Sequence, residues 1–156
     1  MAALDVTIHR RDVLSAEAQA LIAALNGELT SLYPEEGGTH FRLDPSEVAD
    51  GNGAFLVAFR AGVAVGCGAV RRIDTLTGEL KRMYVIPEAR GLGVGQALLV
   101  ALQAEARRLG FARVVLETGV RQARALSLYE RHGFTRIAPF GEYVGSPLSV
   151  CMAKDV

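Results

Sequence analysis

Hydrophobic and polar residues alternate along several short stretches of this chain and recur with a helical period along three longer ones. β-Forming residues alternate from 79 to 86, and Leu99, Leu102, Ala106 and Leu109 then recur at the spacing of one helix face. The same analysis predicts strands over residues 4–10, 54–60, 63–74, 79–86, 111–118, 134–140 and 148–153. It predicts helices that start after Ser15, at the glycines of 91–95 and at Arg121, and that stop at Tyr33, Gly110 and Gly133, with a short helix after Asp44.

The order of these elements constrains the topology. Ala61-Gly62 is a short hairpin connection, so residues 54–74 predict an antiparallel meander, which the strand at 79–86 extends. A strand, a helix and a strand then span residues 79–118, and this order requires a parallel crossover. We expect a single mixed α/β domain (α+β by some schemes) over residues 1–156, with helices flanking a central sheet of about seven strands.

Charge and hydropathy argue against several classes of partner. The 17 basic and 17 acidic residues balance, and no basic run interleaved with aromatics occurs, so a nucleic-acid surface is not expected. No signal-peptide pattern opens the chain, and no apolar run approaches the roughly 20 residues of a membrane span. We expect a soluble cytoplasmic protein, a monomer or homodimer, whose partner is a small molecule.

The two cysteines do not indicate a redox or metal site. Cys67 and Cys151 each lie in an apolar, strand-like stretch, without a C-x-x-C pair or a neighbouring histidine pattern. We expect two buried thiols and no bound metal.

A glycine-rich turn joins the strand at 79–86 to the helix that follows it. Pro87 stops the strand, and Arg90-Gly-Leu-Gly-Val-Gly95 places three glycines where the helix starts. Free N–H groups and the positive end of the helix dipole favour a phosphate at such a position, and side chains at 91, 93 or 95 would block its approach. The expected ligand therefore carries phosphates.

Two familiar phosphate-binding motifs do not match this turn. A P-loop requires Lys-Ser or Lys-Thr after the last glycine, where this chain has Gln96-Ala97. A Rossmann dinucleotide site requires G-x-G-x-x-G in the first βαβ unit, whereas the spacing here is G-x-G-x-G after several earlier strands.

Two segments resemble the GNAT superfamily of N-acetyltransferases. Residues 90–95 match every fixed position of R-x-x-G-x-G, the family motif that binds the pyrophosphate of acetyl-CoA. Residues 125–134, which include Leu-Tyr-Glu-Arg-His-Gly-Phe, resemble the second cofactor-binding segment, a tyrosine-bearing helix that ends in Gly-Phe. The resemblance covers residues 54 to 156 and implies the GNAT fold, with its fourth and fifth strands splayed apart, and acetyl-CoA as cosubstrate.

The resemblance also implies which residues contact the cofactor. Pantetheine would pair with the backbone of residues 83–85, and the pyrophosphate would meet the amides of residues 91–96. The implied cofactor contacts are Met83, Tyr84, Val85, Arg90, Gly91, Leu92, Gly93, Val94, Gly95, Gln96, Gln122 and Tyr129. Gln122 stands where the family often has asparagine, so its direct contact with the cofactor stays open.

Acetyl transfer to an amine requires a base for the ammonium group and an acid for the leaving thiolate. By resemblance, Glu79 occupies the position of a glutamate base found in some family members, and Glu117 on the neighbouring strand is the second candidate. Tyr129 matches the family tyrosine that faces the CoA sulfur and can donate its phenolic proton. The alternatives are a solvated strand-end carboxylate for Glu79 and core packing for Tyr129.

In the resembling fold, the segment after the first strand and the loop before the last strand border the acceptor. The implied acceptor contacts are Glu28, Tyr33, Glu35, Glu36, Glu117 and Tyr143, together with Arg72 or Arg82 for an acceptor that bears a carboxylate. A solvated helix end is the alternative for residues 28–36.

Three functions remain open at this point. The favoured one is transfer of an acetyl group to a small primary amine, directly in a ternary complex. The others are a peptide or protein N-acetyltransferase, and an acyl-CoA-binding module without turnover.

Overall fold

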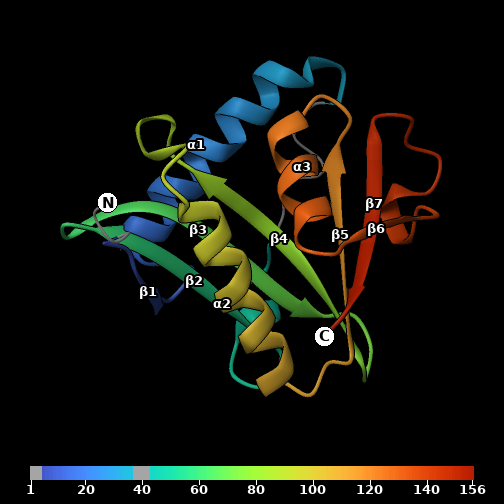
Figure 1. Ribbon diagram of the computed structural model, residues 1–156, viewed down its shortest axis with the longest axis horizontal. Helices are drawn as coiled ribbons and strands as arrows, with labels where there is room; N and C mark the ends of the chain where they lie inside the picture. The colour runs from blue at the N-terminus through green and yellow to red at the C-terminus, as the bar shows by residue number, and fades with distance from the viewer. Residues whose placement is uncertain (1–4, 37–42) are drawn as a thin grey trace.

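The computed structural model describes residues 5–36 and 43–156 as one mixed sheet with helices on both faces (Figure 1). The helices are α1 (Ala16–Leu32), α2 (Val94–Arg108) and α3 (Ala123–Arg131). The strands are β1 (Thr7–Arg10), β2 (Gly53–Arg60), β3 (Val63–Arg72), β4 (Thr77–Val85), β5 (Arg113–Gly119), β6 (Thr135–Ile137) and β7 (Ser149–Asp155). Short 3-10 turns are η1 (Pro34–Glu36), η2 (Pro45–Val48), η3 (Pro87–Ala89) and η4 (Gly141–Tyr143).

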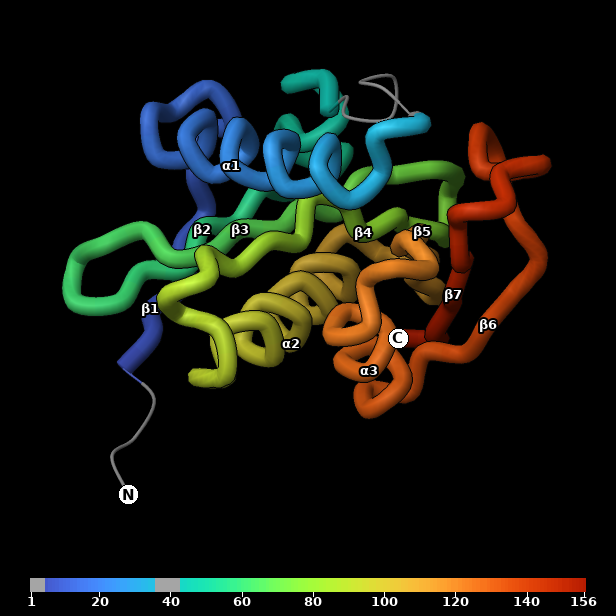
Figure 2. Tube along the Cα trace, turned by 90° about the horizontal axis from the view of Figure 1, so that it is seen from above, coloured from blue at the N-terminus to red at the C-terminus, as the bar shows by residue number. Residues whose placement is uncertain are grey.

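The sheet has the strand order β1-β2-β3-β4-β5-β7-β6, in which β4 and β5 are parallel and all other neighbours antiparallel. Helix α2 forms the crossover between the two parallel strands. Figure 2 shows α1 on one face of the sheet and α2 and α3 on the other. The predicted mixed α/β fold with seven strands is confirmed.

Local signals located most element ends correctly. The Ser15 side chain accepts a hydrogen bond from the Ala18 amide and caps α1, and Gly110 and Gly133 adopt the left-handed conformation just after α2 and α3. Asp44 and Glu47 form a capping box around η2, which confirms the short helix expected there.

Several predicted boundaries were wrong, and in two cases a turn takes the backbone bonds. The strand expected over 63–74 ends at Arg72, since the amides of Ile73 and Asp74 both donate to the Thr77 carbonyl. Helix α3 starts at Ala123 rather than Arg121, because the Gln122 amide donates to the Gly119 carbonyl in a preceding turn. The strand expected over 134–140 is only Thr135–Ile137, as η4 follows closely.

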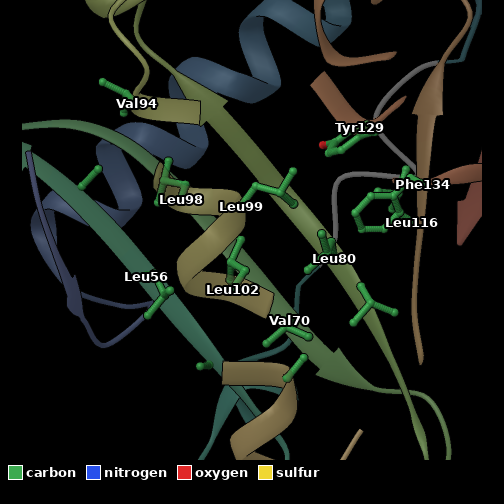
Figure 3. Close-up of a cluster of buried hydrophobic side chains, with 14 of the residues drawn as sticks. Leu56, Val70, Leu80, Val94, Leu98, Leu99, Leu102, Leu116, Tyr129 and Phe134 are labelled. Carbon is green, nitrogen blue, oxygen red and sulfur yellow. The ribbon is translucent and has the colours of Figure 1, made fainter. Parts of the chain in front are cut away.

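The core lies mainly between the sheet and α2. Figure 3 shows the leucines of α2 directed at side chains of β2, β3 and β4. This cluster includes Leu56, Val70, Leu80, Val94, Leu98, Leu99, Leu102, Leu116, Tyr129 and Phe134. Full burial of one such leucine contributes about 1.5–3 kcal/mol. A second cluster, which contains Cys67, packs against α1, and both cysteines are buried free thiols, as expected.

Strands β4 and β5 pair only along their first halves. Thr77 to Leu80 pair with Arg113 to Leu116, after which β5 continues beside β7 alone and β4 beside β3 alone. A bulge at Arg82, whose φ is 60°, interrupts the β3–β4 register and adds to the bending of β4. The two ribbons diverge toward the top of Figure 1. The predicted splay of the fourth and fifth strands is confirmed.

Within residues 5–36 and 43–156, no helix is long and apolar enough to cross a membrane. The same residues contain no group of three or more His, Cys, Asp or Glu side chains placed to hold a metal ion.

Candidate active site

A cavity of about 120 Å³ occupies the space where β4 and β5 diverge. Its walls come from α1, β4, β5, α3 and the η4 loop. The lining residues are Leu25, Leu29, Tyr33, Leu80, Lys81, Arg82, Met83, Glu117, Thr118, Gly119, Gln122, Ala125, Tyr129, Tyr143 and Leu148. Seven of the predicted site residues thus line one cavity: Tyr33, Arg82, Met83, Glu117, Gln122, Tyr129 and Tyr143.

Tyr129 lines this cavity from α3 and also packs in the core. Its ring meets Phe134 edge to face at 5.8 Å, and its side chain is almost fully buried. Figure 3 shows it between the ribbons of β4 and β5. Burial, and then the nearby charge of Glu117, raise the pKa of the phenol above its ordinary value near 10. The phenol is therefore protonated at neutral pH and can act as a proton donor.

Glu117 lines the cavity from β5, beyond the last residue that pairs with β4. The Ser149 hydroxyl, at the start of β7, donates a hydrogen bond to Glu117 Oε2 and lies 3.0 Å from the Ser146 hydroxyl. This contact orients the carboxylate from the side of β7. Glu117 is thus the carboxylate that borders the cavity.

Glu79 lies on β4 but does not line the cavity. The residue is 1% exposed; Arg71 Nε and Nη2 donate to its Oε1 at 3.0 and 2.8 Å, and the Tyr143 hydroxyl donates to its Oε2 at 2.8 Å. Arg71 also pairs with Glu47, which lies in η2. The alternative of a solvated carboxylate is therefore wrong, because Glu79 holds β3, β4 and the η4 loop together.

Two tyrosines that were expected at the acceptor line the cavity. Tyr143, anchored by Glu79, packs edge to face on Phe140 at 5.2 Å. The Tyr33 hydroxyl accepts a hydrogen bond from the Arg121 amide at 2.9 Å and lies against Gly119, where a Cβ would clash with it. Both aromatic rings are fixed by contacts at their hydroxyl ends.

Arg82 lies in the bulge of β4 and reaches toward α1. Only 8% of the residue is exposed, and its Nη1 donates to the neutral Asn26 Oδ1 at 2.9 Å. Desolvation by burial lowers the pKa of the guanidinium, and the nearby Cys67 and Tyr143 oppose this shift.

Other acceptor candidates lie elsewhere. Glu35 pairs with Arg121, and Glu28 pairs with Arg90 at 2.7 Å; neither acid lines the cavity. Arg72 stacks over Phe111 at 4.6 Å and donates to the Leu109 carbonyl. None of these three residues lines the cavity, because their charged groups have other partners, and their contact with an acceptor stays a prediction. The side chain of Glu36 lies outside the described part of the structure.

Several lining residues were not predicted. Leu25 and Leu29 reach the cavity from α1, and Lys81 reaches it from β4. Ser149 does not line the cavity, but its hydroxyl donates a hydrogen bond to Glu117. Among these residues, only Lys81 could have been predicted from the sequence. It lies two residues after the predicted site residue Glu79, and residues two apart on a strand point to the same face of the sheet.

The turn before α2 is shaped to receive an anion. Gly91 and Gly93 have φ values of 80° and 86°, and a Cβ on Gly91 would meet nothing within 4 Å. Gly93 is the N-cap of α2 and has no side chain, so no cap side chain covers the amides of the first turn. The residues present therefore fit a pyrophosphate group at this helix start.

Two predicted cofactor contacts have other partners. The Arg90 side chain runs back along β4: its Nε donates to the Val85 carbonyl at 2.9 Å and its guanidinium lies 5.7 Å from the centre of the Tyr84 ring. Gln122 lines the cavity, but its Oε1 accepts a hydrogen bond from the Gly119 amide at 2.9 Å. Both side chains brace the site.

Comparison with known proteins accounts for this arrangement. The model of the acetyltransferase (GNAT) family matches residues 18–134. The chain is 44% identical over 154 residues to the IAA acetyltransferase of Azospirillum brasilense, covering 97% of this chain and 99% of that protein. It is 36% identical to a crystal structure from Klebsiella pneumoniae assigned as an acyl-CoA N-acyltransferase, with a TM-score of 0.83 and coverage of 98% and 99%.

A further solved structure shares the fold and carries a ligand. It is a GNAT family acetyltransferase from Elizabethkingia anophelis with acetyl-CoA bound, 17% identical, with a TM-score of 0.70 and coverage of 97% and 99%. The splayed strands, the glycine turn without a side-chain cap and the family match over three quarters of the chain all point to the same family. The chain is an acyltransferase that belongs to the GNAT family of acetyltransferases.

Proposed function

We propose that the protein is an acetyl-CoA-dependent N-acetyltransferase that acts on the primary amine of a small molecule, by direct transfer in a ternary complex. The observation that carries this proposal is the cavity in the splay, where Glu117 of β5 and Tyr129 of α3 border one space next to the free edge of β4. A base and an acid on one cavity are what acetyl transfer to an amine requires.

The backbone supplies the cofactor contacts in this proposal. Acetyl-CoA provides an activated acetyl group as a thioester. The amides of residues 91–96 hold its pyrophosphate, and the backbone of Met83 to Val85, which has no β5 partner, is open to the pantetheine amides. An amide near Met83 would stabilise negative charge on the thioester oxygen.

The side chains supply the proton transfers. Glu117 takes the proton from the acceptor ammonium, directly or through water, and Tyr129 gives its phenolic proton to the departing sulfur. Glu79 acts as a positioning residue that holds Tyr143, because both of its oxygens already accept hydrogen bonds. This assignment replaces Glu79 by Glu117 as the favoured base.

The size of the cavity supports a small acceptor over a polypeptide. Its volume of about 120 Å³ is below the roughly 300–1,000 Å³ of common ligand pockets. A module that only binds acyl-CoA would need neither the carboxylate nor the phenol at that place.

Coenzyme A should stabilise the folded protein. A ligand that binds only the native state at 100 times its Kd adds about 2.7 kcal/mol to the free energy of unfolding. The measurement is the melting temperature with and without CoA and acetyl-CoA. A folded protein whose melting temperature stays constant up to saturating CoA would contradict the proposed cofactor.

Replacing Gly93 with valine should weaken CoA binding. A branched side chain costs about 1–2 kcal/mol in the left-handed conformation that Gly93 adopts, so the population of this turn conformation should fall about 5- to 30-fold. The added Cβ also takes up space beside the amides of the turn before α2. The control is Gly62→Val in the β2–β3 hairpin, where φ is 77°. We expect both variants to lose stability and only Gly93→Val to lose CoA affinity in calorimetric titrations. Equal CoA affinities of the two variants would refute the pyrophosphate site at the turn before α2.

A further inference from the structure

Acetylation of an ammonium group requires two protons to leave its nitrogen. In the proposed function, one of them replaces the proton that Tyr129 gives to the sulfur of CoA, and the other must reach bulk water. The carboxylate of Glu117 can hold only one proton at a time. Glu117 must therefore pass its first proton on before it can accept another.

Two serine hydroxyls extend from Glu117 toward the surface. Ser149 Oγ lies 2.5 Å from Glu117 Oε2 and 3.0 Å from Ser146 Oγ. A hydroxyl has one proton, so Ser149, which donates to the carboxylate, accepts from Ser146. Ser146 is half-buried in the loop between η4 and β7, between the exposed residues Gly145 and Pro147. The three groups thus form a chain that starts at a cavity-lining carboxylate and ends in a surface loop.

We propose that Ser149 and Ser146 form a relay that carries the acceptor proton from Glu117 to solvent. The Glu117 carboxyl gives its proton to Ser149 Oγ, Ser149 gives its own proton to Ser146 Oγ, and Ser146 gives its proton to water. Each O–H bond that breaks is replaced by one on the next oxygen, so Glu117 ends as a carboxylate and both serines end neutral. The proposal rests on the proposed function, and both serines are positioning residues that act through Glu117.

The backbone holds the members of this relay in place. In the register of β5 and β7, Glu117 is opposite Cys151, and Ser149 lies two residues before Cys151. Glu117 and Ser149 are therefore diagonal neighbours on one face of the sheet. The Ser149 amide donates to the Ser146 carbonyl at 3.3 Å, and the Ser146 amide donates to the Tyr143 carbonyl at 3.1 Å. These backbone bonds keep the two hydroxyls within reach of each other.

Three other acidic groups near Glu117 are poor acceptors for its proton. Burial raises the pKa values of the Cys151 thiol, the Tyr129 phenol and the Tyr143 phenol. The negative charge of Glu117 contributes to each rise. All three groups therefore keep their own protons at neutral pH. Ser149 differs, because it already bonds to the carboxylate and has a second hydroxyl oxygen on its other side.

The first test replaces the inner serine. Ethylamine, ethanolamine, benzylamine and alaninamide are assayed with the native protein and acetyl-CoA, and the amine that reacts fastest serves for all variants. Ser149→Ala should lower the single-turnover rate about 10- to 150-fold, the size of a hydrogen bond to a charged group. Ser149→Thr keeps the hydroxyl and should restore most of the rate. Ser127→Ala, at an exposed position on α3, is the matched control and should change nothing.

Replacing the outer serine separates a relay from a contact that only orients the carboxylate. Ser146→Ala leaves the bond between Ser149 and Glu117 intact and removes the next oxygen of the chain. We expect the single-turnover rate to fall about 2- to 13-fold, the size of a hydrogen bond between neutral groups. Added imidazole should restore it, because a small mobile base can take the proton from Ser149. A native rate in Ser146→Ala overturns the relay.

Two further measurements connect Ser149 to Glu117. In Glu117→Gln, the additional change Ser149→Ala should not lower the rate further, because no proton then enters the relay. An equal loss in both backgrounds overturns the inference. The second measurement does not depend on turnover: the infrared carboxylate band that is missing from Glu117→Gln should shift in Ser149→Ala and keep its position in Ser149→Thr. An unchanged band in Ser149→Ala overturns the hydrogen bond with which the relay begins.

The outcomes also separate this inference from the proposed function. Acetylation by the native protein together with a full rate in Ser149→Ala overturns the relay alone. Binding of CoA without acetylation of any of the four amines overturns the proposed function, and the relay with it. The CoA-induced shift in melting temperature verifies that each variant is folded; if Ser149→Ala loses this shift, Ser146→Ala and its rescue by imidazole decide.

Discussion

Replacing Tyr129 with phenylalanine is expected to slow acetyl transfer about 10²–10⁴-fold while CoA still binds. The substitution keeps the ring that packs on Phe134 and removes only the hydroxyl group of this cavity-lining residue. Burial keeps the pKa of this phenol above its usual value, so in the native enzyme the proton is available throughout the neutral range.

The contrasting substitution is Tyr129→Ala. If Tyr129 served packing alone, phenylalanine would be harmless and only alanine would lower the melting temperature, by removing a buried ring worth about 3–5 kcal/mol. The rates of the phenylalanine variant should be measured in single turnovers, because slow product release can conceal a change in the chemical step. If Tyr129→Phe reacts at the full single-turnover rate at every pH, water and not Tyr129 supplies the proton to the leaving thiolate.

The fold was largely predictable because its signals are local. Serine and glycine caps, the Ala61-Gly62 hairpin and the glycine turn before α2 each act within a few residues, and the structure has them where the pattern indicated. The errors in strand ends arose where a turn competes for backbone bonds, as at residues 73–77. The alternation of hydrophobic and polar residues along a strand does not show where a turn will take over its backbone hydrogen bonds.

The glycine turn and several residues that line the cavity could be predicted from the sequence, but the partners of the charged side chains could not. Arg71 and Glu79 face each other in the register of β3 and β4, and that pairing decides that Glu79 is buried in an ion pair. The left-handed conformation of Arg82 has no local sequence signal, because non-glycine residues adopt it only when the surrounding structure imposes it. Contacts of this kind depend on the assembled sheet.

The same reason explains Arg90. As part of R-x-x-G-x-G it was expected at the cofactor, yet its guanidinium pairs with Glu28 on α1, 62 residues earlier in the chain. Whether a long side chain turns toward a ligand or toward a neighbouring helix depends on which helix crosses nearby. The motif therefore located the loop without locating this side chain.

Replacing Glu117 with glutamine is expected to lower the rate of the chemical step about 10²–10⁴-fold at neutral pH, where most amines are protonated and require a base. The substitution preserves the size of the side chain and its ability to accept a hydrogen bond from Ser149. Because an amine is already neutral above its own pKa, the variant should recover part of its rate as the pH rises toward 10. The measurement is the single-turnover rate against pH, with the native enzyme beside it.

Glu79→Gln is the matched variant, since it makes the same change on the neighbouring strand. It removes the charge that pairs with Arg71, and we expect a loss of about 3 kcal/mol in the free energy of unfolding, at the low end for a broken buried pair because Arg71 keeps Glu47. Its single-turnover rate at neutral pH should fall less than that of Glu117→Gln, because Glu79 is buried behind Tyr143. The reverse pattern, in a Glu79→Gln protein that is folded and binds CoA, would make Glu79 the base and leave Glu117 as a polar wall of the cavity.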